Sequence, residues 1–488
     1  MDLAGTSTGG HARWALRGAV VAAVLSVVPL AAGDQVRDLE WIDTFVRAEM
    51  ARQKVPGVAM AIVRKEGVVA TKGYGLANVE HNVPVGPDTI FQSGSVGKQF
   101  TSTAVMLLVE QGKIGLDDPI TKFFPDAPAP WRAITVRHLL THTSGIPDYE
   151  DVKDGPASVD LRRDYTEDDL TRFAYKLRLE FPPGSRWNYS NTGYVLLGII
   201  IHKTSGQFYG DLLRDRVFKP LDMKTARIIS EEDIVPNRAG GYRLVKGALK
   251  NQRWVSPTLN TTADGALYLS LRDMVAWDKG LRAGAILEPG SWAQVNAPVK
   301  LNSGHRYPYG FGWSVDTLNG SVRLHHGGSW QGFKTYISRY LGEDLTIIVL
   351  ANLAESDPGR FVDGIAGILV PALATAELKP IPDAEPAVRA RLDALLGLTR
   401  DGRLSPAEFA YLRAGFFPGV AKAYQERLTK LGAIRRVSLL ERKELGDDRV
   451  YTYELDSAAE SLIVTLGLAA DGKVSLFSIR PKEPPPSG

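Results

Sequence analysis

The chain has 488 residues, 44% of them hydrophobic and 23% charged, which is typical of a globular protein of two or three domains. Its formal net charge of +3 is small and no basic stripe with interleaved aromatic residues occurs, which argues against nucleic acid as a partner. The absence of cysteine excludes disulfides, thiolate metal sites and lipoprotein acylation, and leaves the redox compartment open.

The first 33 residues are typical of a secretory signal peptide. Arg13 and Arg17 precede an apolar run at residues 19–28, and residues 30–33 offer small side chains for cleavage. The alternative is an uncleaved N-terminal membrane anchor, although the apolar run is shorter than the about 20 residues that span a bilayer. We therefore expect a periplasmic or secreted protein with no stable membrane span after signal cleavage.

The body of the chain alternates strand-like and helical segments. Residues 58–63 and 68–70 predict a hairpin around a Lys-Glu-Gly turn, and residues 89–91 predict a short strand. The strand leads to Ser95-Val96-Gly97-Lys98, the one Ser-x-x-Lys match in the sequence, and residues 100–111 then predict a helix. If Ser95 opens that helix, its hydroxyl and the Lys98 amine lie on one face.

This pairing predicts covalent catalysis by the serine. An alkyl hydroxyl is a poor nucleophile until a base removes its proton. Lys98 can be that base only if burial or a neighbouring cation lowers its pKa well below the reference of about 10.4. The motif alone is weak evidence, because a helix start with these residues also arises by chance.

Two later segments supply possible partners for the serine. Tyr189-Ser190-Asn191 follows a Pro/Gly-rich loop and precedes an apolar helix predicted at residues 194–201, so it offers a phenolic proton carrier and an amide. Asn191 has the alternative role of capping that helix. His326-Gly327-Gly328-Ser329 follows a strand-like segment, and its two glycines would let a substrate backbone lie close against the strand.

In this order the three segments resemble the motifs of the serine β-lactamase-like superfamily, which are Ser-x-x-Lys, Tyr-x-Asn and Lys-Thr-Gly or His-x-Gly. That superfamily includes class C β-lactamases, D-Ala-D-Ala carboxypeptidases, D-aminopeptidases and carboxylesterases. The resemblance covers roughly residues 36–370 and extends to the segments at 134–146 and 309–313. It implies an α+β fold, with an antiparallel sheet flanked by helices, a helical lobe, and the site in the cleft between them.

The resemblance also implies a role for each motif residue. Ser95 is the acylated nucleophile, Lys98 shares its proton, and Tyr189 stands where the general base stands. Asn191 orients substrate, and the third motif is formed by His326, Gly327 and Gly328. The backbone amides of Ser95 and Ser329 would form the oxyanion hole. No metal or other cofactor is implied.

One departure concerns substrate choice. Lactamases with a Tyr-x-Asn motif usually carry lysine where this chain has His326, and that lysine anchors the substrate carboxylate. A histidine with an unperturbed pKa near 6.5 is mostly neutral at pH 7, which favours peptidase or esterase chemistry and predicts a charge switch near neutral pH. His325 is expected to be structural.

His138 and His142 have the i, i+4 spacing of some metal sites. No glutamate stands where a His-Glu-x-x-His motif requires it and no third ligand is evident, so a packing or loop-ordering role is favoured.

The sequence predicts a second, small α+β domain at residues 391–480, after the domain at 34–375 and a proline-rich linker at 376–390. Ser405-Pro406-Ala407-Glu408 suggests a capped helix start, and strands are expected at 436–440, 450–455, 461–466 and 474–479. Residues 481–488 are expected to form a disordered tail. This domain carries no triad-like motif.

The sequence thus predicts a serine hydrolase that forms an acyl-enzyme on a small-molecule ester, D-peptide or β-lactam. A D-Ala-D-Ala carboxypeptidase or D-aminopeptidase is the first alternative within the class, and a class C β-lactamase is the second. A non-catalytic module that binds penicillin or peptidoglycan is the alternative from a different class. The filled motif positions argue against that module.

Overall fold

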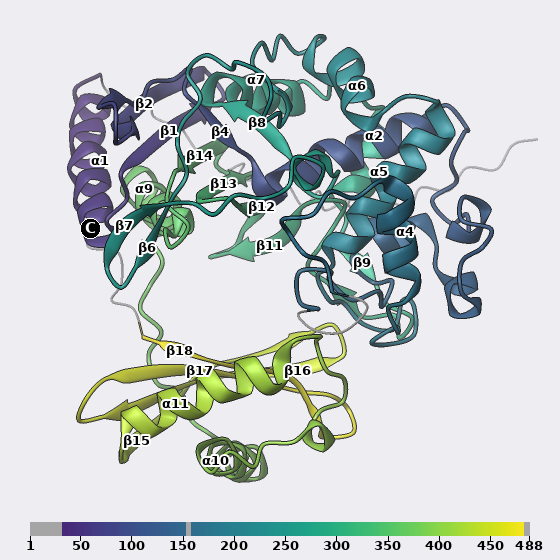
Figure 1. Cartoon of the computed structure of the whole chain (residues 1–488). Coiled ribbons are helices and arrows are strands. Elements are labelled where there is room, and N and C mark those ends of the chain that lie inside the picture. The colour runs from purple at the N-terminus through teal and green to yellow at the C-terminus, as the bar shows by residue number, and fades with distance from the viewer. Residues whose placement is uncertain (1–31, 153–157, 483–488) are drawn as a thin grey trace, which may run out of the picture.

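The computed structural model describes residues 32–152 and 158–482, so the predicted leader at 1–33 and tail at 481–488 lie almost wholly outside the described residues. Figure 1 shows a larger unit built around a sheet and a helical lobe, and a smaller unit formed by the end of the chain. Among the described residues, none of the helices combines the length and the apolar character that crossing a bilayer requires.

The larger unit is organised by a seven-stranded antiparallel sheet with strand order β11-β12-β13-β14-β1-β2-β3. Its strands are β1 (Gly57–Arg64), β2 (Gly67–Asn78), β3 (Val83–Pro84), β11 (Ser314–Leu318), β12 (Ser321–Trp330), β13 (Phe333–Tyr340) and β14 (Leu345–Ala351). The predicted hairpin is confirmed, because β1 pairs with β2. The same strand pairs with β14, with Met60 opposite Val349, so the sheet is complete only when distant parts of the chain meet.

The alternation of β1 divides its side chains between two cores. Met60 and its neighbours two residues away pack with α1 (Ala32–Gln53) and α9 (Pro358–Leu369) on one face of the sheet. Ala59 and Ala61 face the other core, which includes α2 (Lys98–Glu110) and the helical lobe. Because strand side chains alternate between faces, one apolar strand serves both layers.

The helical lobe holds α2 against α5 (Asn191–Ser205), the two helices whose first turns carry Lys98 and Asn191. The other helices of this unit are α3 (Val136–Leu140), α4 (Glu167–Tyr175), α6 (Tyr209–Leu213), α7 (Leu271–Arg282) and α8 (Pro289–Val295). The short strands are β4 (Ile90–Gln92), β5 (Arg227–Ile228), β6 (Tyr242–Val245), β7 (Ala248–Asn251), β8 (Leu267–Ser270), β9 (Val299–Lys300) and β10 (Arg306–Tyr307).

The smaller unit is a four-stranded antiparallel sheet with two helices (Figure 1). Its elements are α10 (Pro386–Arg400), α11 (Ala421–Leu431), β15 (Ile434–Leu445), β16 (Asp448–Ser457), β17 (Ser461–Leu468) and β18 (Val474–Pro481). It has a hydrophobic cluster of its own, drawn from residues 388–479. A separate core is the mark of a domain, so we propose an N-terminal domain at residues 34–375 and a C-terminal domain at residues 386–481.

Two local expectations differ from the structure here. The C-terminal domain begins with α10 at Pro386, inside the segment predicted as linker, because Pro386 occupies the first helical turn, where a missing N–H costs nothing. The predicted capped helix at Ser405 is wrong: Pro406–Glu408 forms a single 3₁₀ turn, and the Ser405 side chain makes no cap hydrogen bond.

Candidate active site

Ser95 lies where two backbone segments that are distant in the chain approach each other. β4 leads into a 3₁₀ turn, Gly94–Gly97, and α2 begins directly after it at Lys98. A Cβ on Gly94 would lie 2.3 Å from the amide nitrogen of Ser329 on β12, and Gly94 has a φ of +49°. Only glycine permits this approach, which places the first and third motifs side by side.

Lys98 is fully buried and makes three polar contacts. Its Nζ lies 3.1 Å from Ser95 Oγ, 2.6 Å from Asn191 Oδ1 and 2.5 Å from the carbonyl oxygen of Asp264. Burial lowers its pKa from 10.5 to about 8, although the negative charges of Asp264, Asp148 and Glu150 act in the opposite direction. The depressed pKa that the sequence required of a lysine base is therefore present.

The contacts of Lys98 also fix the direction in which its lone pair points. The amide oxygen of Asn191 and the carbonyl oxygen of Asp264 can only accept hydrogen bonds. A neutral Lys98 amine therefore donates its two protons to them and directs its lone pair at the remaining partner, Ser95 Oγ. This is the arrangement that a general base for the serine requires.

Asn191 is held by protein groups on both ends of its side chain. Its Oδ1 accepts from Lys98, and its Nδ2 donates to Asp148 Oδ2 at 3.0 Å. The helix cap is the preceding residue, since Ser190 Oγ accepts from the amide of Gly193 at 3.3 Å. Asn191 therefore orients Lys98 here, and the capping alternative for it is wrong.

Tyr189 presents a buried hydroxyl that lacks a well-formed hydrogen bond in the described part of the chain. Ser95 is near enough to lower the pKa of the phenol, but burial is the larger effect and raises that pKa well above 10. The Lys98 ammonium lies 4.9 Å from the centre of the Tyr189 ring. The phenol is thus a neutral proton carrier next to the nucleophile and its lysine.

A chain of hydrogen bonds connects the second and third motifs beneath Tyr189. The Ser190 amide donates to His142 Nδ1 at 3.1 Å, so His142 carries its proton on Nε2 and donates it to the Tyr309 hydroxyl at 3.2 Å. Tyr309 in turn donates to His326 Nε2 at 2.9 Å, and His326 Nδ1 donates to the Gly327 carbonyl at 2.7 Å. We assign these tautomers from the hydrogen-bond partners.

The two histidines of this hydrogen-bond network, His142 and His326, are buried and neutral. Burial, together with the charge of Lys98, lowers the pKa of His326 to about 3 and that of His142 well below 6.5. The expected charge switch of His326 near neutral pH is therefore wrong, because desolvation penalises the imidazolium. Both ring nitrogens of His142 are already engaged, which supports the structural role predicted for it over metal binding.

The rest of the third motif lies on β12 beside the nucleophile. Gly328 pairs with Thr335 on β13, and a Cβ on Gly328 would lie 2.0 Å from the carbonyl oxygen of Ser93. His325 contacts Asp316 at 3.1 Å and Tyr336 at 2.7 Å, partners outside the reaction centre, in agreement with the structural role predicted for it.

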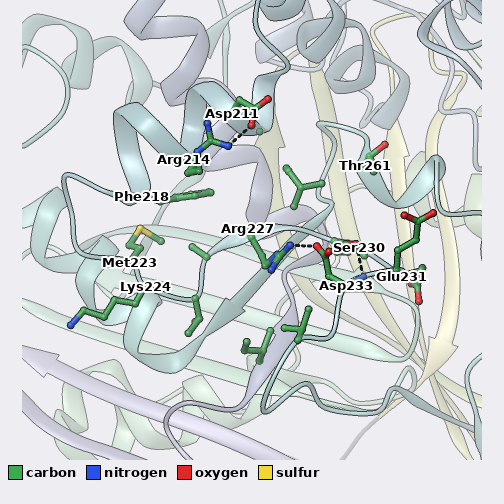
Figure 2. Close-up of a pocket in the computed structure, with 18 of the residues that line it drawn as sticks. Asp211, Arg214, Phe218, Met223, Lys224, Arg227, Ser230, Glu231, Asp233 and Thr261 are labelled. Carbon is green, nitrogen blue, oxygen red and sulfur yellow. Dashed lines mark hydrogen bonds and ion pairs between the residues drawn. The ribbon is translucent and has the colours of Figure 1, made fainter.

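Three cavities are candidates for ligand binding, and one of them lies away from the motifs. Figure 2 shows that cavity, of about 1020 Å³, which is lined by residues between 208 and 261 together with Ile90, and by none of the predicted site residues. A small pocket of about 20 Å³ is lined by Ser95, Asn191, Glu150 and Ser329, among others. A third cavity, of about 680 Å³, includes Tyr189 in its wall.

Prediction from the sequence did not identify the residues that hold the motif side chains in place. Asp148 accepts from both nitrogens of Asn191, and Asp264 supplies the carbonyl for Lys98. Tyr309 and His142 lie in the segments at 309–313 and 134–146, which resemble the superfamily. That resemblance was the one feature of the sequence that pointed to them. Contact between segments far apart in the chain gives each of these residues its role, and no local pattern marks it.

The family comparison agrees with this geometry. The family model described as Beta-lactamase matches residues 42–371, about two thirds of the chain, so the chain belongs to that family. Penicillin-binding protein 4* of Bacillus subtilis is 30% identical over 297 residues, which cover 58% of this chain and 65% of that protein. D-aminopeptidase of Gluconobacter oxydans is 28% identical over 317 residues, 64% of this chain and 58% of the other. The chain thus spans less than two thirds of the length of these curated relatives.

Solved structures show the same fold, and one extends over both domains. The octameric penicillin-binding protein homologue from Pyrococcus abyssi is 26% identical, with a TM-score of 0.59, and covers 92% of this chain and 97% of its own. D-amino acid amidase from Ochrobactrum anthropi, solved with L-phenylalanine amide, is 27% identical with a TM-score of 0.57, and covers 69% of this chain and 97% of its own. The predicted α+β fold is therefore confirmed.

Proposed function

We propose that this protein is a serine hydrolase that cleaves an amide or ester through an acyl-enzyme on Ser95. The observation that carries the proposal is the buried Lys98 amine, whose two fixed acceptors leave its lone pair directed at Ser95 Oγ. A serine next to a base that is itself oriented by a third group is the signature of an activated nucleophile. A non-catalytic binding module would not need this arrangement.

In the acylation step, Ser95 Oγ attacks the carbonyl carbon while neutral Lys98 takes the serine proton. The backbone amides of Ser95 and Ser329 donate hydrogen bonds to the oxygen that becomes negatively charged, and losing one such donor typically costs about 3–4 kcal/mol in the barrier. The Tyr189 hydroxyl passes a proton to the leaving nitrogen or oxygen and is reprotonated from Lys98. Water then attacks the acyl-enzyme, and the acid is released.

In the reactive form, with Lys98 neutral, the charges of the site favour a substrate with an ammonium group over one with a carboxylate. The expected carboxylate anchor, His326, is neutral because burial lowers its pKa to about 3. Glu150 and Asp264 line the small pocket beside Ser95, and their charges raise the pKa of Lys98. A free amino group next to the scissile carbonyl would be attracted to these carboxylates.

The size of that pocket favours a small acyl group. Its volume of about 20 Å³ is little more than one water molecule needs, so an alanyl group fits better than a large side chain. The relatives named D-aminopeptidase and D-amino acid amidase support the D configuration. We therefore propose amides and esters of small D-amino acids with a free amino group as the substrate class, with no metal or other cofactor, in the periplasm or outside the cell.

A panel of substrates tests this proposal. D-alaninamide and D-alanine methyl ester should be hydrolysed faster than their L enantiomers, than N-acetyl-D-alaninamide, and than a cephalosporin. A phosphonate ester should inactivate the enzyme and be found by mass spectrometry on Ser95, and Ser95→Ala should abolish turnover without loss of fold. An adduct on any other serine would refute the assignment. Efficient cephalosporin hydrolysis would instead support a β-lactamase.

A further inference from the structure

The cavity of about 680 Å³ has residues of both domains in its wall, and Tyr189 of the candidate active site is one of them. The N-terminal domain contributes Trp187, Asn188, Tyr189 and Tyr307 to its wall, and the C-terminal domain contributes the segment at residues 409–416 and parts of β16 and β18. Its volume falls within the roughly 300–1,000 Å³ of small-molecule sites. The sequence assigned no chemistry to the C-terminal domain, yet that domain forms much of this wall.

The lining of the cavity is mainly aromatic and aliphatic. The C-terminal domain contributes Phe409, Tyr411, Leu412, Phe416, Leu476 and Phe477. On the opposite side the Trp187 ring stacks on Tyr307, with centroids 4.4 Å apart and planes 12° from parallel. Leu476 is 41% exposed, so its side chain is accessible to an apolar ligand in the cavity.

Polar contacts across the domain boundary hold this wall in place. Arg186 donates to Asp448 at 3.1 Å, with both side chains about one fifth exposed. The amide of Ala414 donates to Glu180 at 2.9 Å. Gly415 has a φ of +78°, and a Cβ there would lie 2.5 Å from the Asp151 carbonyl oxygen, so the 409–416 segment is fitted closely to the N-terminal domain.

The position of Tyr189 determines which part of a substrate would enter the cavity. In the proposed reaction this phenol gives its proton to the leaving atom, so the leaving atom must contact it. The acyl part lies against the small pocket next to Glu150, which does not include Tyr189. A leaving group that extends past the Tyr189 ring would enter the cavity, because Tyr189 forms part of the cavity wall.

We propose that this cavity is a leaving-group subsite, built jointly by the two domains, for a bulky apolar and preferably aromatic amine or alcohol. The inference rests on the proposed function, because it uses Tyr189 as the proton donor to the leaving atom. Leu476 and the aromatic side chains of the 409–416 segment are its specificity-determining residues. The natural substrate would then be a small D-amino acid joined to a large apolar group.

A pair of substrates with one acyl group tests the subsite. N-benzyl-D-alaninamide and D-alaninamide release amines of similar basicity, so their intrinsic reactivity is comparable. The ratio of their kcat/KM values should favour the benzyl amide by about tenfold or more, since even one added methylene in an apolar pocket can change kcat/KM by that factor. A ratio near one in the full-length enzyme would overturn the proposal.

Two variants of Leu476 locate the effect in the C-terminal domain. Leu476→Trp should occupy the part of the cavity next to β18 and lower the ratio about tenfold, and Leu476→Ser should lower it by a smaller factor by removing apolar contact. Leu341→Trp is the matched control, because Leu341 is also an exposed leucine (48%) and does not line the cavity, and its ratio should stay unchanged. An unchanged ratio in both Leu476 variants would refute the subsite.

A binding measurement separates this proposal from the proposed function. Calorimetry on Ser95→Ala should detect N-benzyl-D-alaninamide, and adding Leu476→Trp should weaken its affinity about tenfold, whereas Leu341→Trp should not. Binding of this kind in a wild-type enzyme that hydrolyses neither amide would reject the hydrolase and keep the subsite. Affinity that is equal with and without Leu476→Trp would reject the subsite whatever the turnover.

Discussion

The pH dependence of acylation should move toward acid when the charge of Asp264 is removed. Asp264 is the largest of the carboxylate effects that raise the pKa of Lys98. Its backbone carbonyl accepts the Lys98 hydrogen bond, and its side chain accepts from the Tyr149 hydroxyl at 3.0 Å. Asp264→Asn keeps the backbone carbonyl, the shape and an oxygen acceptor for Tyr149, and removes only the charge.

The size of the effect follows from the protonation of Lys98. With a pKa of about 8, roughly one tenth of the enzyme carries the neutral amine at pH 7. Loss of a nearby anion disfavours the ammonium and lowers the pKa, typically by about 1–3 units. With a one-unit decrease, roughly half of the amine is neutral at pH 7, so kcat/KM at this pH should rise about fivefold. Near pH 10 Lys98 is neutral in both proteins, and the two rates should converge.

The assay is kcat/KM for a neutral ester, measured from pH 6 to 10, because this constant reports groups of the free enzyme. Tyr149→Phe is the control, since it removes the hydrogen bond to Asp264 and keeps the charge, and its profile should stay near pKa 8. An apparent pKa that does not fall in Asp264→Asn, in a variant with an unchanged melting temperature, would show that Lys98 is not the base. A profile rising only above pH 10 would point to the Tyr189 phenolate.

Three further results are expected. Lys98→Ala and Tyr189→Phe should each lower kcat by orders of magnitude. The loss of kcat in the double variant should be far smaller than the product of the two single losses, because the residues act as one proton-transfer unit. A fully multiplicative loss would contradict this. The ratio of kcat/KM for a carboxylate-bearing ester over a neutral ester should show no step between pH 5 and 8 attributable to His326, because burial holds its pKa near 3; a rise that His326→Gln abolishes would show a charged anchor. Tyr309→Phe should destabilise the protein by about 2–4 kcal/mol in chemical denaturation, because it leaves a ring nitrogen unpaired on each of two buried histidines, and an unchanged stability would reject the hydrogen-bond chain.

Local elements were predictable where a short pattern determines them. Apolar periodicity and turn residues predicted the β1–β2 hairpin, the helix after the Ser-x-x-Lys motif and the four strands of the C-terminal domain. All of these elements are present. The capped helix at Ser405 failed because the chain turns away after one 3₁₀ turn and Phe409 joins the domain core. Tertiary packing overrode a local preference worth about 1 kcal/mol.

The candidate site was predictable as a set of residues, and its chemistry was not. The three motifs identified Ser95, Lys98 and Tyr189 because these residue types at these spacings resemble a known family. The order of strands β12, β13, β14 and β1 brings the third motif to the nucleophile, and glycines at the crossing allow the contact. The order of the motifs along the sequence does not reveal that the third motif contacts the nucleophile.

What the sequence determined by itself was therefore the family, the element types and the candidate nucleophile, since these depend on neighbours a few residues apart. The tertiary structure alone decided the protonation states and the cavity of about 680 Å³ that residues of both domains line. The lowered pKa values of Lys98 and His326 arise from burial among segments that are distant in the chain, as the contact of Lys98 with Asp264 and the effect of Lys98 on His326 show. The wall that the C-terminal domain adds next to Tyr189 depends likewise on how two independently formed cores meet.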